Sequence, residues 1–363
     1  MRIVTVLGAR PQFIKASVVS RAMRAAADID EVVVHTGQHF DAGMSAVFFA
    51  ELAMIAPTHH LGIHGGGHGE MTGRMLIALE PVLQHESPDA VLVYGDTNST
   101  LAGALAAAKL HIPVAHVEAG LRSFNLSMPE EINRIVTDRL SQWLFTPTAA
   151  ADAHLLREGI DAARIERVGD VMYDVALEAR TRVGVASGAI AALGLAAQGY
   201  VLATIHRAET TDDPARLAAV VEGLGAVAER IPVVWPLHPR TRVVLEQQGR
   251  LVGLPAALHV IDPVGYLDMV RLEKDAALIA TDSGGVQKEA FFHRVPCVTL
   301  RDETEWTELV EAGWNRLESP RSGPRIRDAV LGAIGSRGAE IDPYGSGDAA
   351  ARIVARMRAD LGA

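Results

Sequence analysis

Short apolar runs alternate with helical patterns along the chain. Each run is rich in β-branched and aliphatic residues and is followed by a turn of small residues and a stretch with helical spacing. The runs lie at 2–7, 31–36, 90–94, 114–117 and 143–145, and again at 200–205, 233–236, 259–261, 276–280 and 297–300. Strands of a parallel sheet covered on both faces are apolar almost throughout, and helices connect them. The pattern therefore predicts an α/β protein with two doubly wound, Rossmann-like domains.

The length of 363 residues fits two domains at about 150 residues each. The periodic pattern weakens in an Ala- and Gly-rich stretch just before residue 200. We predict an N-terminal Rossmann-like domain over 1–170, a crossover over 171–199 and a C-terminal Rossmann-like domain over 200–346. The final helical pattern, 347–363, is expected to pack back on the N-terminal domain.

Composition excludes several classes of protein. With 49% hydrophobic and 21% charged residues, the chain can bury a full core and is not disordered or fibrous. Its formal net charge of -10 argues against a nucleic-acid partner. The single cysteine, Cys297, excludes an intrachain disulfide framework and favours a reducing, cytoplasmic location. No window approaches about 18 uninterrupted apolar residues, so we expect no membrane association.

Ligands of doubly wound domains bind at the carboxyl ends of the strands, which we expect to face a cleft between the domains. The segment 8–15 follows the first strand, and Pro11 suits the first turn of a helix. Arg10 beside that helix N-terminus suggests a phosphate or carboxylate site. The alternative is that Arg10 and Lys15 are ordinary surface charges.

Carboxylates follow two later strands and begin a helix. Asp96 or Thr97 could cap the next helix, and Asp96 could instead act as an acid or base. Glu118 ends an apolar strand, where a carboxylate is costly to bury without a partner, so a function is favoured. Glu130 and Arg134 lie one helical turn apart, which is also typical of a surface ion pair.

The second half has its own candidate anion site. His206-Arg207 and His238 with Arg240 end successive strands, although a lone histidine there is usually structural. Ser283-Gly284-Gly285 lets the backbone approach a ligand closely, and Glu289 could accept both hydroxyls of a ribose. We predict nucleotide-phosphate binding; the alternative is a helix capped by Ser283.

The histidines do not predict a metal site. His59-His60 and the pair His64 and His68 have suitable atoms, but they lie in a glycine-rich loop without a matching acidic group. Solvated loop histidines explain them better, so we expect no bound metal.

Taken together, these motifs resemble the non-hydrolysing UDP-N-acetylglucosamine 2-epimerases over essentially the whole chain. The matching segments are 8–15, 37–39, 95–100, 117–122, 129–134, 206–207, 262–263, 281–289 and 301–302. The resemblance implies a glycosyltransferase-B-like fold, a UDP-sugar substrate, neither metal nor NAD as cofactor, and a homodimer. It also implies a role in supplying precursors of cell-surface polysaccharide.

The resemblance implies that Asp96, Glu118 and Glu130 are the acid–base carboxylates, with His206 as a further catalytic residue. It implies that the UDP-sugar is held by Arg10, Lys15, Arg134, His206, Pro263, Tyr266, Ser283, Gly284, Gly285, Glu289 and Arg301. The chemistry independently requires more than one such group, because inverting C2 removes a proton from one face and delivers one to the other. The C2 hydrogen is not acidic, which favours elimination of UDP to a glycal and its re-addition.

Three departures from the family pattern affect the expected substrate and regulation. Ala208 stands where relatives often have a second Arg, and Thr304-Glu305-Trp306 replaces a Glu-Arg-Pro segment. Gln38, His39 and Arg74 are candidate allosteric residues, but position 41 is Asp where substrate-regulated members tend to carry Gln. The segment 8–15 and Thr304-Glu305-Trp306 also resemble the branch that acts on UDP-2,3-diacetamido-2,3-dideoxyglucuronate.

Our main prediction is the reversible conversion of UDP-N-acetylglucosamine to UDP-N-acetylmannosamine. The first alternative is the same epimerisation on UDP-2,3-diacetamido-2,3-dideoxyglucuronate. A hydrolysing 2-epimerase and a glycosyltransferase are further alternatives, as is a UDP-sugar-binding regulator without catalysis. Three carboxylates at one site argue against the regulator, because negative charge does not help to bind an anion.

Overall fold

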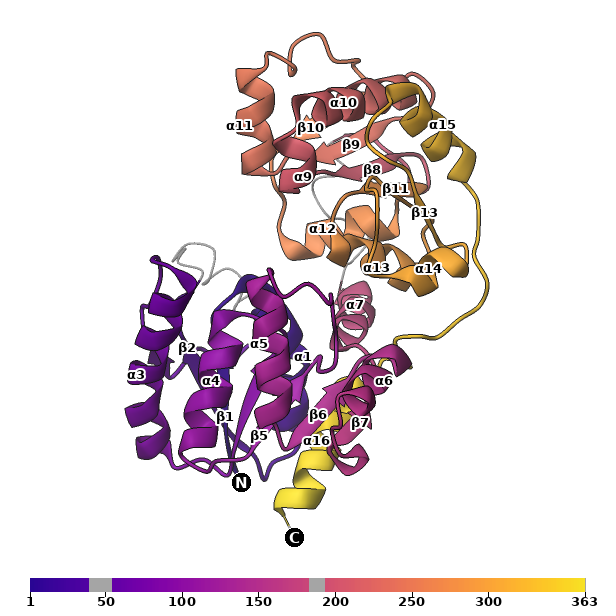
Figure 1. Cartoon of the computed structure of the whole chain (residues 1–363). Coiled ribbons are helices and arrows are strands. Elements are labelled where there is room, and N and C mark those ends of the chain that lie inside the picture. Colours follow the sequence, from indigo (N-terminus) through magenta and orange to yellow (C-terminus); the bar gives the residue numbers. More distant parts are fainter. Residues whose placement is uncertain (39–53, 183–192, 363) are drawn as a thin grey trace. The chain divides into compact units, whose positions relative to one another are not determined.

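The computed structural model describes residues 1–38, 54–182 and 193–362. The chain forms two compact units, Met1–Val175 with Asp342–Ala363 and Ala176–Ile341 (Figure 1). Each unit is a parallel sheet with helices on both faces, and helix α7 (Val171–Arg182) contains the boundary between the units.

The first unit is built on a seven-stranded sheet in the order β3-β2-β1-β4-β5-β6-β7. Its strands are β1 (Arg2–Leu7), β2 (Asp30–His35), β3 (His59–His60), β4 (Ala90–Tyr94), β5 (Val114–Val117), β6 (Trp143–Thr146) and β7 (Ile165–Arg167). Its helices are α1 (Arg10–Ala25), α3 (His68–Glu86), α4 (Asn98–Lys109), α5 (Pro129–Leu140), α6 (Ala149–Arg157), the 3-10 turn η1 (Ala162–Arg164) and α16 (Ala349–Leu361).

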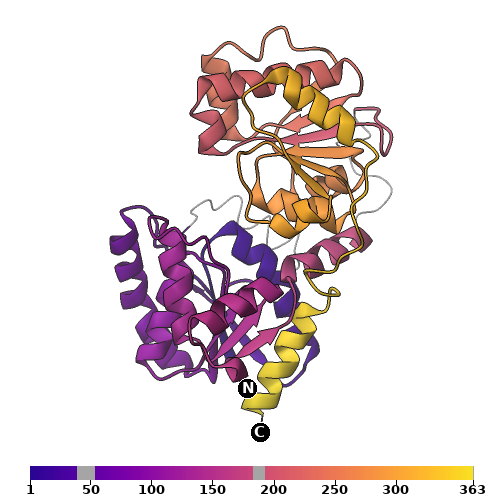
Figure 2. The same ribbon diagram turned by 45° about the vertical axis from the view of Figure 1, so that its right-hand side comes forward.

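Both faces of this sheet are apolar, which explains the continuous runs in the sequence. Val4 and Val6 of β1 pack in one cluster with Leu79 of α3 and Ala102 of α4. Ile3 of the same strand points to the opposite face and is equally buried. Helices α1 and α16 pack against each other on that opposite side (Figures 1 and 2).

Helix α16 is tied to the first unit at both ends. The buried carboxylate of Asp174 accepts hydrogen bonds from the backbone N–H groups of Ala349 and Ala350, at 3.2 and 2.8 Å. At the other end, the indole of Trp143 donates to Asp360 at 2.7 Å. The helix N-terminus therefore has an acceptor in the core rather than in solvent.

The second unit has a six-stranded sheet in the order β10-β9-β8-β11-β12-β13. Its strands are β8 (Val201–Thr204), β9 (Val233–Pro236), β10 (Leu258–Ile261), β11 (Leu278–Thr281), β12 (Cys297–Thr299) and β13 (Asn315–Leu317). Its further helices are α9 (Ala208–Thr211), α10 (Pro214–Ala228), α11 (Pro239–Gln247), α12 (Tyr266–Lys274), α13 (Gly284–Phe292), α14 (Thr307–Glu311) and α15 (Gly323–Ala333). Helices α10 and α15 cover one face, and α12 and α13 cover the other (Figure 2).

The predicted fold class is confirmed, because both sheets are parallel and doubly wound. Three strands were not predicted, namely β3, β7 and β13, and all three lie at sheet edges. Each is two or three residues long. Over the described ranges, no helix combines the length and apolar character needed to cross a membrane.

We expect Asp174→Ala to lower the free energy of unfolding by about 1–3 kcal/mol, because two buried N–H groups lose their acceptor. Urea denaturation near neutral pH measures this loss. Asp348→Ala is the matched control, since Asp348 occupies the N-cap position of α16 without making a side-chain cap hydrogen bond. Equal losses in the two variants would show that the Asp174 contacts do not stabilise α16.

Candidate active site

The strand order reverses once in each sheet. In the first unit the reversal lies between β1 and β4, and in the second between β8 and β11. The loops that leave the carboxyl ends of two such strands run to opposite sides, which leaves a crevice where ligands of this fold class bind. The loops after β1 and β4, and those after β8 and β11, carry the motifs singled out from the sequence.

Gln12 links the two loops at the first reversal. Its side-chain oxygen accepts from the backbone N–H groups of Gly8 and Ala9, at 2.8 and 3.0 Å. Its amide nitrogen donates to the carbonyl of Tyr94 and the hydroxyl of Thr100, both at 2.9 Å. The start of α1, which carries Arg10, is thus fixed against the end of β4.

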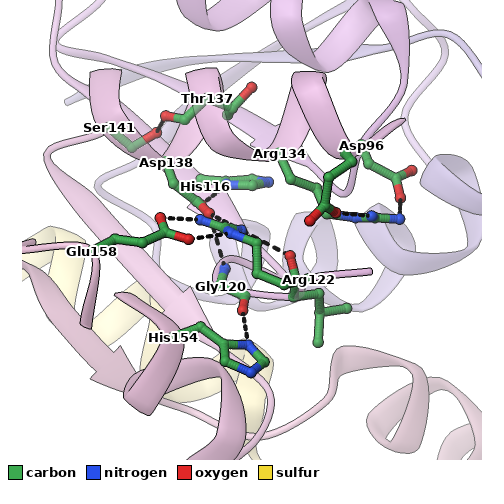
Figure 3. A network of polar contacts seen from close by, with 12 residues as sticks. Asp96, His116, Gly120, Arg122, Arg134, Thr137, Asp138, Ser141, His154 and Glu158 are labelled. Atoms are coloured by element: carbon green, nitrogen blue, oxygen red, sulfur yellow. Dashed lines mark hydrogen bonds and ion pairs between the residues drawn. The ribbon is translucent and has the colours of Figure 1, made fainter. Parts of the chain in front are cut away.

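Of the two candidate caps of α4, Asp96 and Thr97, the structure has Thr97. Thr97 caps α4 by accepting a hydrogen bond from the backbone N–H of Thr100. Asp96 instead binds the guanidinium of Arg134 at 2.5 Å (Figure 3). Asn133 donates to the backbone carbonyl of Asp96 at 2.8 Å. Two residues of α5 therefore hold the Asp96 turn.

Glu118 stands directly after β5 in an unusual backbone conformation. Its φ of 69° lies in the left-handed region, which non-glycine residues rarely adopt. Its carboxylate binds the ammonium group of Lys15, and both side chains are largely buried. A Cβ atom placed on Gly95 would lie 3.4 Å from this carboxylate and 3.5 Å from the ammonium. The structure thus brings Lys15, Glu118 and the Gly95–Asp96 turn together.

The two adjacent glutamates of α5 differ in their contacts. Glu131 is buried and accepts backbone hydrogen bonds from Ser123 and Phe124, at 2.9 and 2.8 Å. Burial alone would raise the pKa of Glu131, but these bonds and the pair with Arg134 lower it overall. Among the described residues, Arg134 pairs with Glu131 and Asp96 rather than with Glu130. The surface ion pair considered from the sequence is therefore wrong, and Glu130 begins α5 partly exposed.

A buried charged network lies behind these turns (Figure 3). Asp138 of α5 accepts from the His116 ring at 2.7 Å, from Arg122 at 2.7 Å and from the backbone N–H of Gly120 at 3.2 Å. Burial would raise the pKa of Asp138, but His116 and Arg122 outweigh it and lower the pKa. Asp138 is therefore an ionised carboxylate in the core.

In the second unit, the buried Asp282 fixes the turn after β8. Its carboxylate accepts from the backbone N–H groups of His206, at 3.0 and 3.1 Å, and of Arg207 at 3.0 Å. Burial raises the pKa of Asp282 more than these contacts lower it. The rings of His206 and His238 lie 5.3 Å apart, so the two histidines predicted from successive strand ends do come together.

The loop after β12 covers the first turn of α13. Trp306 donates its indole N–H to the carbonyl of Gly284 at 2.9 Å. Glu305 binds Arg301 at 2.8 Å and lies 3.8 Å from Arg207. A Cβ atom placed on Gly284 would lie 2.4 Å from the Glu305 carboxylate, so the end of that side chain lies directly over the helix start.

Ser283 and Gly285 leave the helix start accessible. Ser283 occupies the N-cap position of α13, but its side chain makes no cap hydrogen bond in the described part of the chain. Apart from its own helix turn, no part of the described chain lies within 4 Å of a Cβ placed on Gly285. The simple interpretation of Ser283 as a capping residue is therefore wrong.

Glu289 faces a buried acidic neighbour. Burial, together with the charge and hydrogen bond of Glu289, raises the pKa of Glu273 well above its usual range. Both side chains act on Tyr266 as well, whose pKa is also raised, first by burial. Pro263, in the loop before α12, is exposed. Tyr266, Glu273 and Glu289 form one cluster on α12 and α13.

The two candidate allosteric residues that the structure describes, Gln38 and Arg74, make different contacts. Gln38 accepts hydrogen bonds from the N–H and hydroxyl of Ser99, at 3.1 and 2.8 Å, and so lies at the start of α4. Arg74 donates to the carbonyls of His64 and Gly65. His39 lies outside the described residues.

Neither the histidines nor other side chains assemble a metal site in residues 1–38, 54–182 and 193–362. His59 lies in β3 and contacts Glu86 at 2.7 Å.

Comparison with known proteins decides the family. The sequence profile described as UDP-N-acetylglucosamine 2-epimerase matches residues 21–358. The chain belongs to the UDP-N-acetylglucosamine 2-epimerase family. It is therefore a UDP-sugar 2-epimerase of the non-hydrolysing kind, as the sequence motifs predicted.

Individual relatives match over nearly their whole length. UDP-2,3-diacetamido-2,3-dideoxy-D-glucuronate 2-epimerase of Pseudomonas aeruginosa is 55% identical over 97% of this chain and 98% of its own. The crystal structure of Methanocaldococcus jannaschii UDP-GlcNAc 2-epimerase in complex with UDP-GlcNAc and UDP has 43% identity and a TM-score of 0.86, covering 99% of this chain and 100% of that chain.

The fold extends beyond the epimerases. The glycotransferase of kitacinnamycin, at 14% identity, matches with a TM-score of 0.59 over 99% of this chain and 94% of its own. The predicted glycosyltransferase-B-like fold of this epimerase is thereby confirmed.

Sequence motifs alone did not identify Gln12, Asn133 or Asp138 as supports of the site. Gln12 is a polar residue among the mostly apolar residues that α1 buries, which is a signal, whereas the residues that α5 buries are all polar, so Asn133 and Asp138 gave no such contrast. Arg134 was predicted from the family to bind UDP, whereas its contacts in the structure are with Asp96 and Glu131.

We expect the free energy of unfolding to fall less with rising pH in Glu273→Gln than in the wild type. Because its pKa is raised in the folded chain, Glu273 stabilises the fold fully below its unfolded pKa, and this contribution is lost as pH rises towards the folded value. Glutamine cannot ionise in either state. The free energy of unfolding of the variant, relative to wild type, should therefore increase from about pH 5 to about pH 8 in urea titrations. A constant difference would show that Glu273 is ionised in the folded chain.

Proposed function

We propose that this epimerase inverts C2 of UDP-2,3-diacetamido-2,3-dideoxyglucuronate. The observation that carries the proposal is the 55% identity, over nearly the full length of both chains, to the Pseudomonas aeruginosa enzyme named for that substrate. The match to the UDP-GlcNAc 2-epimerase of known structure is lower, at 43%. Conversion of UDP-N-acetylglucosamine, our main prediction from the sequence, becomes the second candidate.

The loop after β12 supports this order of candidates. Thr304-Glu305-Trp306 departs from the Glu-Arg-Pro pattern of many relatives. The indole of Trp306 donates a hydrogen bond to the carbonyl of Gly284, and the ammonium of Lys288 lies 4.4 Å from the centre of the Trp306 ring. The departure thus changes side chains at the first turn of α13, where we propose that UDP binds.

The proposed reaction is elimination followed by re-addition. A base removes the proton from C2, the C–H electrons form a C1–C2 double bond, and the C1–O bond breaks with its electrons leaving on UDP. UDP then returns its oxygen to C1 while an acid delivers a proton to the opposite face of C2. The cycle needs one group that acts as a base and another that acts as an acid, and the net change is inversion at C2.

The first unit supplies the proposed acid–base groups. Asp96 and Glu118 follow neighbouring strands, and Glu130 lies at the start of α5. Arg134 and Lys15 fix the directions of the Asp96 and Glu118 carboxylates by direct ion pairs. A fixed carboxylate near the reacting carbon lowers the entropic cost of proton transfer.

The second unit supplies most of the proposed UDP site. The N–H groups at the start of α13 and the side chains of His206 and Arg301 favour a diphosphate. Glu289 accepts the ribose hydroxyls, beside Tyr266. We also propose that Arg10, at the start of α1, stabilises the departing diphosphate. The full proposed UDP-sugar set is Arg10, Lys15, Arg134, His206, Pro263, Tyr266, Ser283, Gly284, Gly285, Glu289 and Arg301.

Purified protein in D2O should incorporate deuterium at C2 of UDP-2,3-diacetamido-2,3-dideoxyglucuronate, with its C2 epimer appearing in NMR spectra. UDP-N-acetylglucosamine, incubated in parallel, should turn over at least about tenfold more slowly, because each 1.4 kcal/mol of lost transition-state binding costs a factor of ten. Faster turnover of UDP-N-acetylglucosamine would replace the proposed substrate with the second candidate.

Asp96→Asn and Glu118→Gln should each lower kcat by about 10²–10⁴-fold, since each removes an acid–base group while keeping its shape. UDP affinity, measured by calorimetry, should stay close to that of the wild type. Glu80→Gln, on the exposed side of α3, is the matched control and should leave kcat unchanged. A variant with near-normal kcat would remove its residue from the proposed mechanism.

A further inference from the structure

His116 is completely buried and lies between two hydrogen-bond acceptors. Its Nδ1 is 2.7 Å from the carboxylate of Asp138 (Figure 3). Its Nε2 is 2.7 Å from the backbone carbonyl of Gly95. Both distances are those of strong hydrogen bonds. The ring therefore connects α5 with the turn that presents Asp96.

Neither acceptor can supply the hydrogen for its bond. A carbonyl has no proton to donate, and Asp138 is held ionised by Arg122 and by the N–H of Gly120. A neutral imidazole would direct a lone pair at one of the two oxygens. Both bonds form only if both ring nitrogens carry a hydrogen, which makes His116 an imidazolium.

The surrounding charges match this protonation state. Asp138 and Glu158 are the carboxylates of the network, and Arg122 binds both, contacting Glu158 through two bonds of 2.7 Å. Arg122 supplies one positive charge against two negative ones. A positive His116 completes two balanced pairs, whereas a neutral ring leaves the buried Asp138 to share the single charge of Arg122 with the partly exposed Glu158.

The same carboxylate also holds the second turn. Asp138 accepts from the N–H of Gly120, two residues after Glu118. Gly120 has a φ of 79°, and Glu118 itself has a positive φ, so this turn is a conformation that a free chain rarely adopts. One buried carboxylate therefore fixes the turn of Glu118 directly and the turn of Asp96 through His116.

We propose that His116 is a doubly protonated positioning residue that, with Asp138, sets the Asp96 and Glu118 turns relative to each other. It does not touch substrate, because its side chain is fully buried. Its catalytic consequence rests on the roles proposed above for Asp96 and Glu118. Its protonation state does not depend on those roles.

The protonation state is tested on the wild-type enzyme by NMR with ¹⁵N-labelled histidine. The His116 signal, assigned by its loss in His116→Gln, should show a hydrogen on both ring nitrogens in the buffer of the kinetic assay. His35 gives the contrasting signal of a neutral ring, because burial lowers its pKa to about 4. A His116 ring with one bare nitrogen would overturn the proposal.

The positioning role is tested by kinetics. In His116→Gln, the amide nitrogen can donate to one acceptor, but the amide oxygen faces the other. We expect kcat to fall at least about tenfold, because small displacements of reacting groups are costly, while KM and UDP affinity stay within about twofold. A purely structural role would lower thermal stability and leave the kcat of the folded fraction near that of the wild type, which would overturn the positioning role.

His35→Gln is the matched control, a buried histidine of the same unit whose ring stacks on Phe13 at 5.0 Å. It should cost stability without the selective fall in kcat. The kinetics use whichever UDP-sugar the wild type converts, so an error in the proposed substrate appears in the wild type alone. If His116→Gln does not fold, the wild-type signal is assigned instead from correlations between the His116 ring and its own backbone, and the NMR result still decides the protonation state.

Discussion

The reversal of strand order in each sheet is the constraint on which the site depends. Between β1 and β4, and again between β8 and β11, adjacent parallel strands send their chains in opposite directions. Backbone N–H groups and short polar side chains can then line the opening without breaking the sheet. Such loops need hydrogen-bond partners. The buried side chain of Gln12 supplies them, because it hydrogen-bonds to the loops on both sides of the reversal. In this fold class, topology therefore determines where a ligand site can form before any single residue is considered.

Most of the sheet architecture could be predicted from the sequence because both faces of each sheet are covered. Central strands such as β4, with every residue buried, leave an apolar run that no surface helix would show. The missed strands have the opposite character. Ile165–Arg167 and Asn315–Leu317 are short and include charged or exposed residues, since an edge strand needs only one neighbour. Their positions follow from pairing across the sheet, which local pattern does not encode.

The candidate site could be predicted to the same depth. Asp96 and Glu118 are candidates because a carboxylate just after an apolar strand is conspicuous. The partners of those carboxylates could not be found, because they come from other elements. Lys15 precedes Glu118 by 103 residues, and Arg134 follows Asp96 by 38. The i,i+4 spacing of Glu130 and Arg134 suggested a local ion pair. In the structure, the Arg134 guanidinium instead forms its ion pairs with Asp96 and Glu131.

The division of the chain also constrains the order in which the molecule is completed. The second unit is continuous in sequence, whereas the first is assembled from residues on both sides of it. The sheet with the carboxylates is made early, but the residues that reach Asp174 are made only after the whole second unit. During synthesis on the ribosome, the first unit must therefore keep the surface that receives α16 uncovered until the last helix emerges. A chain released before that point would carry the candidate catalytic residues on a unit that lacks one of its packing helices.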